Sequence, residues 1–160
     1  LPDPILFGGG HENERRAGTE NLAGIAALVE AMEQFVTTPI FSRPNIQPLT
    51  DSLAVLTEID GVNLSSPISC KLANTISFTI SGTDSMTLLA ALDMEGICVS
   101  SGSACSAGSL NPSHVISAMG RSDEDANSLV RFSLGRETKE EDITFVLNKF
   151  PEIIERVRTS

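Results

Sequence analysis

The sequence predicts a small α/β (α+β) domain of three to four short strands covered by helices. Apolar residues recur at helical spacing in several stretches, and they alternate with polar residues between Asn74 and Ser81. Gly or Pro separates most of these stretches. Hydrophobic residues make up 41% of the 160 residues, which is enough for a packed core in one domain of ordinary size.

The first 38 residues are predicted to contain one strand and one helix. Residues 5–7 form a short apolar run before three glycines, and such a strand needs partners that are not close in sequence. From Thr19, a suitable N-cap, a helix is expected to run to about residue 38, where Pro39 disfavours its continuation. Its apolar residues fall on one stripe: Leu22, Ile25, Val29, Met32 and Val36.

Residues 39–160 are predicted to form the main domain. Three prolines in residues 39–48 indicate a linker, and an amphipathic helix over residues 50–59 follows it. A half-buried antiparallel strand is then expected at 74–81, followed by a helix at 84–95 and a short buried strand at 97–99. A short helix is expected from Asn111-Pro112 to Gly120, and a further strand at 128–134. The last helix is opened by a capping box at 138–141, and Pro151 is expected to kink or break it.

The charge balance argues against several classes of partner. The chain has 21 acidic and 11 basic side chains, a formal net charge of -10, and such a surface repels nucleic acid and anionic membranes. No apolar run approaches the ~20 residues of a membrane span, and no signal segment opens the chain. We therefore expect a cytoplasmic protein with neither nucleic acid nor membrane as partner.

The cysteines do not form a metal or disulfide pattern. Cys70, Cys98 and Cys105 are irregularly spaced without a CxxC pair, so neither a zinc site nor a disulfide scaffold is expected. Cys98 lies between two β-branched residues and is expected to be a buried structural residue. Cys105 lies in a run of small residues at 100–109, which indicates either an exposed, mobile thiol or a flexible loop with an incidental cysteine.

Arg131 interrupts an apolar strand, where a charged side chain needs a partner. Its planar fork suits a carboxylate ligand, and a salt bridge with an acidic residue of the chain is the alternative. Thr19 at a helix start is compatible with anion binding, although capping explains it fully. Arg136 is expected at the surface.

Six segments together resemble the C-terminal part of the pyridoxal-phosphate-dependent cysteine desulfurases of the iron–sulfur-cluster and nitrogen-fixation type, in aminotransferase class V. The Ser-Gly-Ser-Ala-Cys motif that ends at Cys105 is highly specific. The segments are residues 8–12, 16–21, 90–96, 99–106, 109–115 and 130–136. The resemblance implies the small C-terminal domain of a fold-type I pyridoxal phosphate enzyme, with residues 1–18 a remnant of an absent large domain, residues 19–38 a connecting helix and about 100–111 a mobile loop.

The resemblance also implies a reaction and its residues. Such enzymes remove sulfur from L-cysteine, give L-alanine, and pass a cysteine persulfide to an acceptor or scaffold protein. The position of Cys105 matches the nucleophile, and that of Arg131 matches the group that binds the substrate carboxylate. The position of Thr19 matches a residue that reaches the phosphate of pyridoxal phosphate in the other subunit of a homodimer.

The chain departs from the family where the Schiff-base lysine is concerned. None of its three lysines lies in a matching motif, and His11 stands where the family commonly has Gln. We therefore expect the 160 residues alone to be inactive. A non-catalytic sulfur-carrier or regulatory module is the alternative function, and another enzyme of the same superfamily is a related one.

Overall fold

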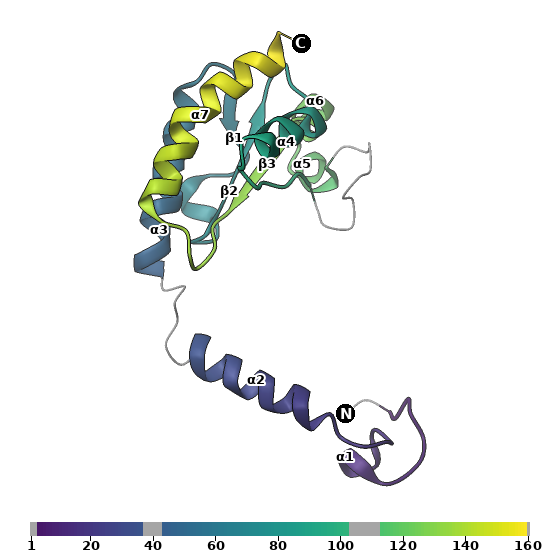
Figure 1. Ribbon diagram of the computed structural model, residues 1–160. Helices are drawn as coiled ribbons and strands as arrows, with labels where there is room; N and C mark the ends of the chain where they lie inside the picture. Colours follow the sequence, from purple (N-terminus) through teal and green to yellow (C-terminus); the bar gives the residue numbers. More distant parts are fainter. Residues whose placement is uncertain (1–2, 37–42, 103–112, 160) are drawn as a thin grey trace. The chain divides into compact units, whose positions relative to one another are not determined.

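The computed structural model describes residues 3–36, 43–102 and 113–159 (Figure 1). The chain divides into two units, an N-terminal unit (Leu1–Ile40) and a sheet unit (Phe41–Ser160). No helix among the described residues is long and apolar enough to cross a membrane.

The N-terminal unit contains one helical turn and one regular helix. The turn, α1 (His11–Glu14), contains Glu12 and Asn13 in left-handed backbone geometry, with φ of 52° and 56°. The strand expected at residues 5–7 does not form, and its one pairing is an isolated bridge between Leu6 and Arg16. A strand needs a neighbour along its length, and the described part of this unit does not supply one.

Helix α2 (Leu22–Phe35) confirms the predicted helix but not its predicted cap. Asn21 is the N-cap, and its Oδ1 accepts a hydrogen bond of 3.0 Å from the Gly24 amide. Thr19 is not the cap because the helix begins only at Leu22, and the Thr19 carbonyl accepts a 2.7 Å hydrogen bond from the Arg16 guanidinium in the turn before the helix. The apolar stripe of α2 is exposed within the chain; Leu22, for example, is 75% exposed.

The sheet unit is built on three antiparallel strands in the order β1-β2-β3. The strands are β1 (Val62–Leu64), β2 (Thr75–Ile80) and β3 (Leu129–Ser133). The last two lie within the strands predicted at residues 74–81 and 128–134.

The strand predicted at residues 97–99 is wrong, and so is the burial of Cys98. Gly96 adopts a φ of +78° after helix α4 (Ser85–Met94), and the Ile97 amide bonds back to the Leu92 carbonyl at 2.9 Å. The segment then pairs with the sheet at a single bridge, between Ser100 and Arg131. Ile97 is buried whereas Cys98 is exposed, because adjacent residues of an extended segment face opposite sides.

The register of β2 on β3 sorts their side chains onto two faces. Ile76 lies opposite Phe132 and Phe78 opposite Val130, and these four residues are buried in the main core. The Phe78 and Phe132 rings meet edge to face at 6.0 Å, and Phe132 meets Phe150 in the same way at 5.6 Å. The alternate residues, which include Ser77 and its partner Arg131, face the other side of the sheet.

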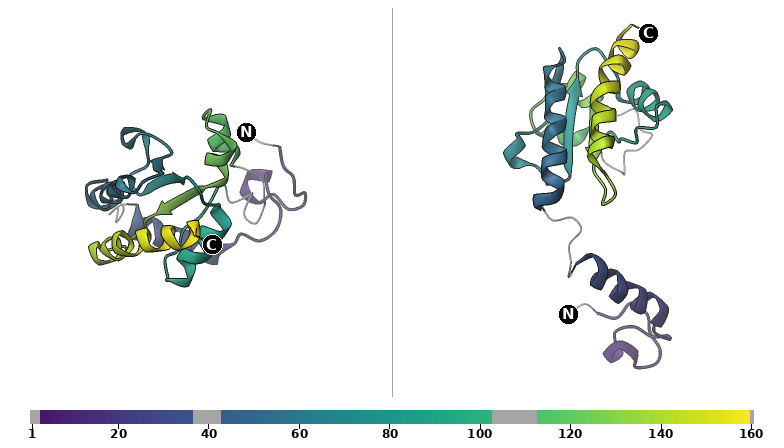
Figure 2. Two further views of the ribbon diagram at one scale, coloured as in Figure 1. Left: turned by 90° about the horizontal axis from the view of Figure 1, so that it is seen from above. Right: turned by 60° about the vertical axis from the view of Figure 1, so that its left-hand side comes forward.

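Helices α3 (Arg43–Ser52), α4 and α7 (Glu140–Arg158), with the 3₁₀ segment Leu53–Glu58, complete the main core. Figure 2 shows α3 beside α7 in the sheet unit. The linker predicted at 39–48 is wrong over residues 43–48, because α3 begins at Arg43; residues 39–42 lie outside the described residues. Burial of Ile46 and Thr50 stabilises this helix, and the Thr50 hydroxyl donates to the Ile46 carbonyl at 3.1 Å.

Helix α7 differs from the sequence prediction in two respects, its N-cap and the effect of Pro151. Its N-cap is Lys139, whose amide donates to the Asp142 carboxylate at 2.9 Å, while the Thr138 hydroxyl accepts from the Gly135 amide instead. Pro151 does not break the helix. Its neighbours in the chain, Phe150 and Ile153, are buried in the core, and this packing outweighs the missing backbone hydrogen bond.

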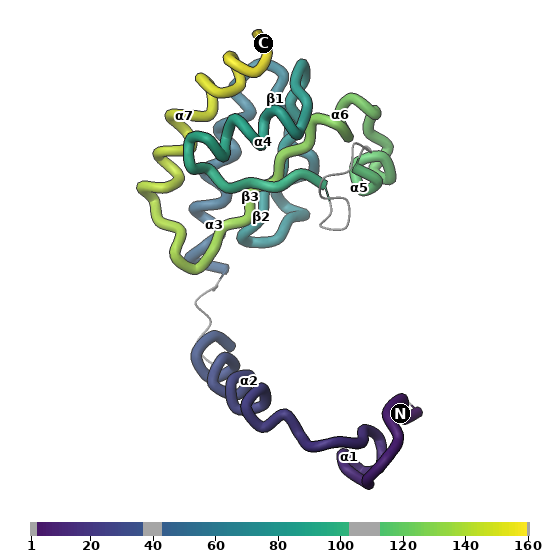
Figure 3. Tube along the Cα trace, turned by 45° about the vertical axis from the view of Figure 1, so that its right-hand side comes forward, coloured from purple at the N-terminus to yellow at the C-terminus, as the bar shows by residue number. Residues whose placement is uncertain are grey.

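The second face of the sheet carries a smaller cluster. Short helices α5 (His114–Ala118) and α6 (Asp123–Asn127) contribute Ile116 and Ala126, which pack on Leu129 of β3. Figure 3 shows both helices away from α3 and α7. The helix predicted from Asn111-Pro112 is thus found from His114; the predicted start lies outside the described residues.

Asp84, the N-cap of α4, allows a test of this fold. Hydrogen bonds from the Thr87 side chain and from its amide, which lies 3.0 Å from Asp84 Oδ1, hold the pKa of the Asp84 carboxyl below its ordinary value of 3.8. We predict that Asp84→Ala lowers the free energy of unfolding by about 1 kcal/mol at pH 7. Because folding lowers the pKa of Asp84, its charged carboxylate contributes fully to the free energy of unfolding when the pH is above the ordinary pKa. This contribution is lost as the pH falls through the pKa of the folded protein.

Urea unfolding at pH 7 and pH 3 measures both effects, and Asp84→Asn is the control because it keeps a capping oxygen without the charge. The advantage of the wild-type protein over Asp84→Asn in the free energy of unfolding should be smaller at pH 3 than at pH 7. An advantage of the same size at both pH values would contradict the assignment.

Candidate functional site

Arg131 is held on both its backbone and its side chain by the segment that precedes Cys105 in the sequence. Its amide donates to the Ser100 carbonyl at 2.7 Å, and the Ser100 amide donates back to the Arg131 carbonyl at 3.1 Å. The guanidinium Nε donates to Ser100 Oγ and Nη1 donates to the Gly102 carbonyl, both at 3.1 Å. The side chain is half-buried and has a fixed direction.

The guanidinium keeps unused hydrogen-bond donors. Of its five N–H groups, those on Nε and Nη1 account for its contacts with described residues. The salt bridge that the sequence left open as an alternative is not present among the described residues, since no carboxylate there lies within 4.0 Å of Arg131. A planar cation with free donors on one edge is suited to a carboxylate from outside the described part of the chain.

A cavity of about 230 Å³ adjoins Arg131 between the second face of the sheet and helix α5. Ser77 lies directly opposite Arg131 on β2, and the Ser65 amide donates to the Ser77 carbonyl at 2.9 Å. The residues that line the cavity include polar and small ones: Ser65, Ser66, Ser77, Gly102, Ser113 and Arg131. They also include apolar ones: Val115, Ile116, Met119 and Leu129.

The other two predicted site residues lie elsewhere. Cys105 lies outside the described residues; the nearest described residue before it in the sequence is Gly102, whose carbonyl binds Arg131. Thr19 belongs to the N-terminal unit and is exposed. The neighbouring Glu20 accepts a 2.9 Å hydrogen bond from His11, and its pKa is lowered first by its own backbone amide and then by that histidine.

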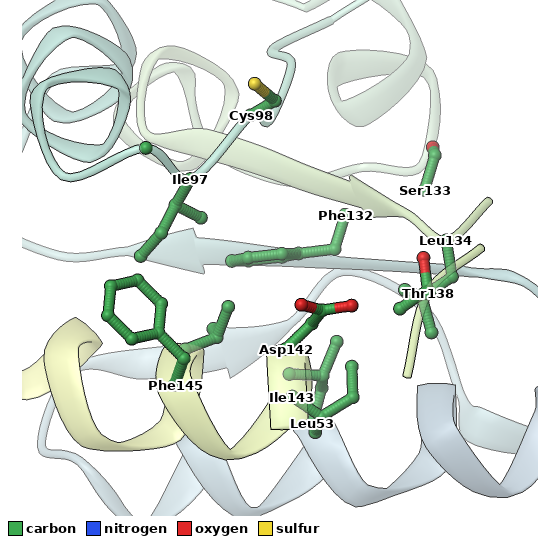
Figure 4. A pocket seen from close by; sticks show the side chains of 12 residues that line it. Leu53, Ile97, Cys98, Phe132, Ser133, Leu134, Thr138, Asp142, Ile143 and Phe145 are labelled. Carbon is green, nitrogen blue, oxygen red and sulfur yellow. The ribbon is translucent and has the colours of Figure 1, made fainter. Parts of the chain in front are cut away.

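A second cavity, of about 250 Å³, lies between β3 and the start of α7 (Figure 4). Cys98 is on its rim, and the thiol points away from Asp142 in the close-up view. The Asp142 carboxylate already accepts a hydrogen bond from the Lys139 amide, and most of the other residues that line the cavity are apolar. We assign this cavity to packing and not to chemistry.

The lysines of the chain do not provide a free amine at the Arg131 cavity. Lys71 is paired with Asp51 at 2.8 Å and its side chain is 6% exposed, and Lys149 is paired with Glu152 at 3.5 Å. Lys139 is the N-cap residue of α7, away from the residues that line the cavity. Within the described residues there is also no group of three or more His, Cys, Asp or Glu placed to hold a metal ion.

Sequence analysis found Arg131 but missed the serines around it. Ser77 had a usable signal, because its place in the alternation of β2 put it on the polar face. Ser65 and Ser113 had none, since β1 is only three residues long and α5 starts at His114.

Comparison with known proteins agrees with this architecture. The model of the family Aminotransferase class-V matches residues 9–146. A protein named cysteine desulfurase IscS, from Dictyoglomus turgidum, is 40% identical over 158 residues, which are 98% of this chain and 40% of that protein.

Two solved structures are similar in fold. A NifS-like protein superposes with a TM-score of 0.80 at 29% identity, over 96% of this chain and 39% of the other. The NifS-like protein from Rickettsia africae gives a TM-score of 0.76 at 33% identity, over 95% of this chain and 40% of that one. The chain thus spans about 40% of the length of these relatives. Because the family model matches residues 9–146 of the chain, the chain belongs to the aminotransferase class V family.

Proposed function

We propose that the protein is a cysteine desulfurase and that these 160 residues provide its substrate-carboxylate site and its sulfur acceptor. One observation carries the proposal. Arg131 presents free donors beside a cavity, and it is fixed there by Ser100 and Gly102, which shortly precede Cys105. The names of the relatives, cysteine desulfurase IscS and NifS-like protein, support the same reaction.

In this proposal Arg131 binds the α-carboxylate of L-cysteine and fixes the orientation of the amino acid. Cys105 accepts the sulfur atom as a thiolate nucleophile. The net reaction balances: L-cysteine and the Cys105 thiol give L-alanine and a persulfide on Cys105. The carbon–sulfur bond of the substrate breaks and a sulfur–sulfur bond forms, without an external oxidant.

Pyridoxal phosphate is the cofactor that the family implies, and the lysines of this chain do not fit it. Lys71 and Lys149 are engaged in ion pairs, and neither they nor Lys139 line the Arg131 cavity. We propose that the amine that binds the cofactor comes from residues outside this sequence. We propose that Thr19 approaches the cofactor phosphate of the other subunit in a homodimer.

We further propose that the Cys105 persulfide is handed to a sulfur-acceptor or scaffold protein for iron–sulfur cluster assembly in the cytoplasm. The competing proposal is a sulfur-carrier or regulatory module without catalysis, which the engaged lysines favour. The two differ in whether the protein releases sulfide from L-cysteine.

Replacement of Cys105 tests the sulfur step. In the protein carrying its cofactor, Cys105→Ser should abolish sulfide release and persulfide formation with L-cysteine, because a hydroxyl does not take up the substrate sulfur. Cys98→Ser is the matched control, since Cys98 is also exposed but has no part in the proposed reaction. Sulfide release by Cys105→Ser at the wild-type rate would remove Cys105 from the mechanism.

Replacement of Arg131 tests the carboxylate step. Arg131→Lys keeps the charge but loses the planar fork, and it should weaken the apparent affinity for L-cysteine by roughly 1–3 kcal/mol, the usual worth of a charge-assisted hydrogen bond. Arg156→Lys on the surface of α7 is the control. An unchanged affinity together with a lowered melting temperature would show that Arg131 is structural.

A further inference from the structure

Four residues from four neighbouring segments form one polar row across the second face of the sheet. Ser100 pairs with Arg131, Arg131 pairs with Ser77, and the Ser65 amide donates to the Ser77 carbonyl. Directly paired residues of an antiparallel sheet point to the same side. Ser113, just before α5, lines the same cavity as Ser65, Ser77 and Arg131.

Two hydroxyls in this wall have no hydrogen-bond partner. Ser65 is 3% exposed and Ser113 is 6% exposed, and neither Oγ contacts a polar atom in the described part of the chain. Burial of a hydroxyl without a partner costs free energy, and buried polar side chains are nearly always satisfied. Both serines line the cavity that Arg131 also lines. The two hydroxyls and the guanidinium therefore have unused hydrogen-bonding groups at the same cavity.

We propose that Ser65 and Ser113, together with Arg131, form a binding site for a small carboxylate, in which the two hydroxyls donate hydrogen bonds to the anion. This inference rests on the proposed function, because it adds two binding residues to the carboxylate site for which Arg131 was proposed.

The chemistry of the wall favours an anion with a planar pair of oxygens. Arg131 offers donors without any acceptor, and a serine hydroxyl turns to donate when its partner is an anion. A guanidinium edge matches the two coplanar oxygens of a carboxylate. Ile116 and Met119 also line the cavity, and these apolar residues suit a ligand whose other end is small and uncharged.

Titration of the isotope-labelled 160-residue chain with sodium acetate tests the proposal without reference to activity. Backbone amide resonances of Ser77, Ser100 and Arg131 should shift in a saturable manner, and sodium chloride at the same ionic strength should not reproduce the shifts. Ser65→Ala with Ser113→Ala should weaken acetate binding by at least about tenfold, as expected for the loss of two hydrogen bonds to a charged group. The melting temperature of this variant without ligand should be unchanged or slightly higher than that of the wild-type protein, because each replaced hydroxyl has no hydrogen-bond partner.

Thr79→Val is the matched control. The Thr79 hydroxyl is also fully buried and unpartnered and lies on the same face of the sheet, but it does not line the cavity. Its replacement should leave acetate binding unchanged.

The proposal would be overturned by no saturable acetate binding, by equal weakening with Thr79→Val, or by tighter binding of sulfate than of acetate at equal ionic strength. If Arg131→Ala abolishes acetate binding while the serine replacements do not affect it, the hydroxyls are not part of the site and the proposed function stands. Sulfide release by the protein carrying its cofactor tests the proposed function separately.

Discussion

The antiparallel pairing of β2 with β3 is the constraint on which the rest of the sheet unit depends. Its register places Phe78 and Phe132 in the main core, and Ser77 and Arg131 on the opposite face. A slip of one residue would exchange the two sets, exposing the aromatic residues and burying the guanidinium. The register that stabilises the core is therefore also the register that builds the candidate site.

This arrangement explains how a charged residue is retained in an apolar strand. The alternate residues of β3, Val130 and Phe132, gain free energy by burial, roughly 1.5–3 kcal/mol for each large apolar side chain. Arg131 lies between them and keeps its stem against the sheet while its charged group meets Ser100 and Gly102. The site is thus supported by the core without being part of it.

The elements with a strong local signal were predictable from the sequence, and the rest depended on tertiary contacts. Apolar alternation located β2, and an apolar stretch interrupted by Arg131 located β3, each to within a residue at each end. Burial in the core keeps α7 continuous at Pro151, and the turn after Gly96 leaves Cys98 exposed. Neither effect can be recognised from a local sequence pattern. Arg131 was recognisable as a charge in an apolar strand, whereas Ser65 and Ser113 reach the cavity only through folding.

The central claim is that the cavity beside Arg131 is a carboxylate site, and a crystal structure of the protein grown with L-alanine tests it most directly. We expect the carboxylate of L-alanine to lie within hydrogen-bond distance of the Arg131 guanidinium and of the Ser65 or Ser113 hydroxyl. A cavity that contains only water in the presence of L-alanine, with Arg131 paired to an aspartate or glutamate of the protein, would contradict it.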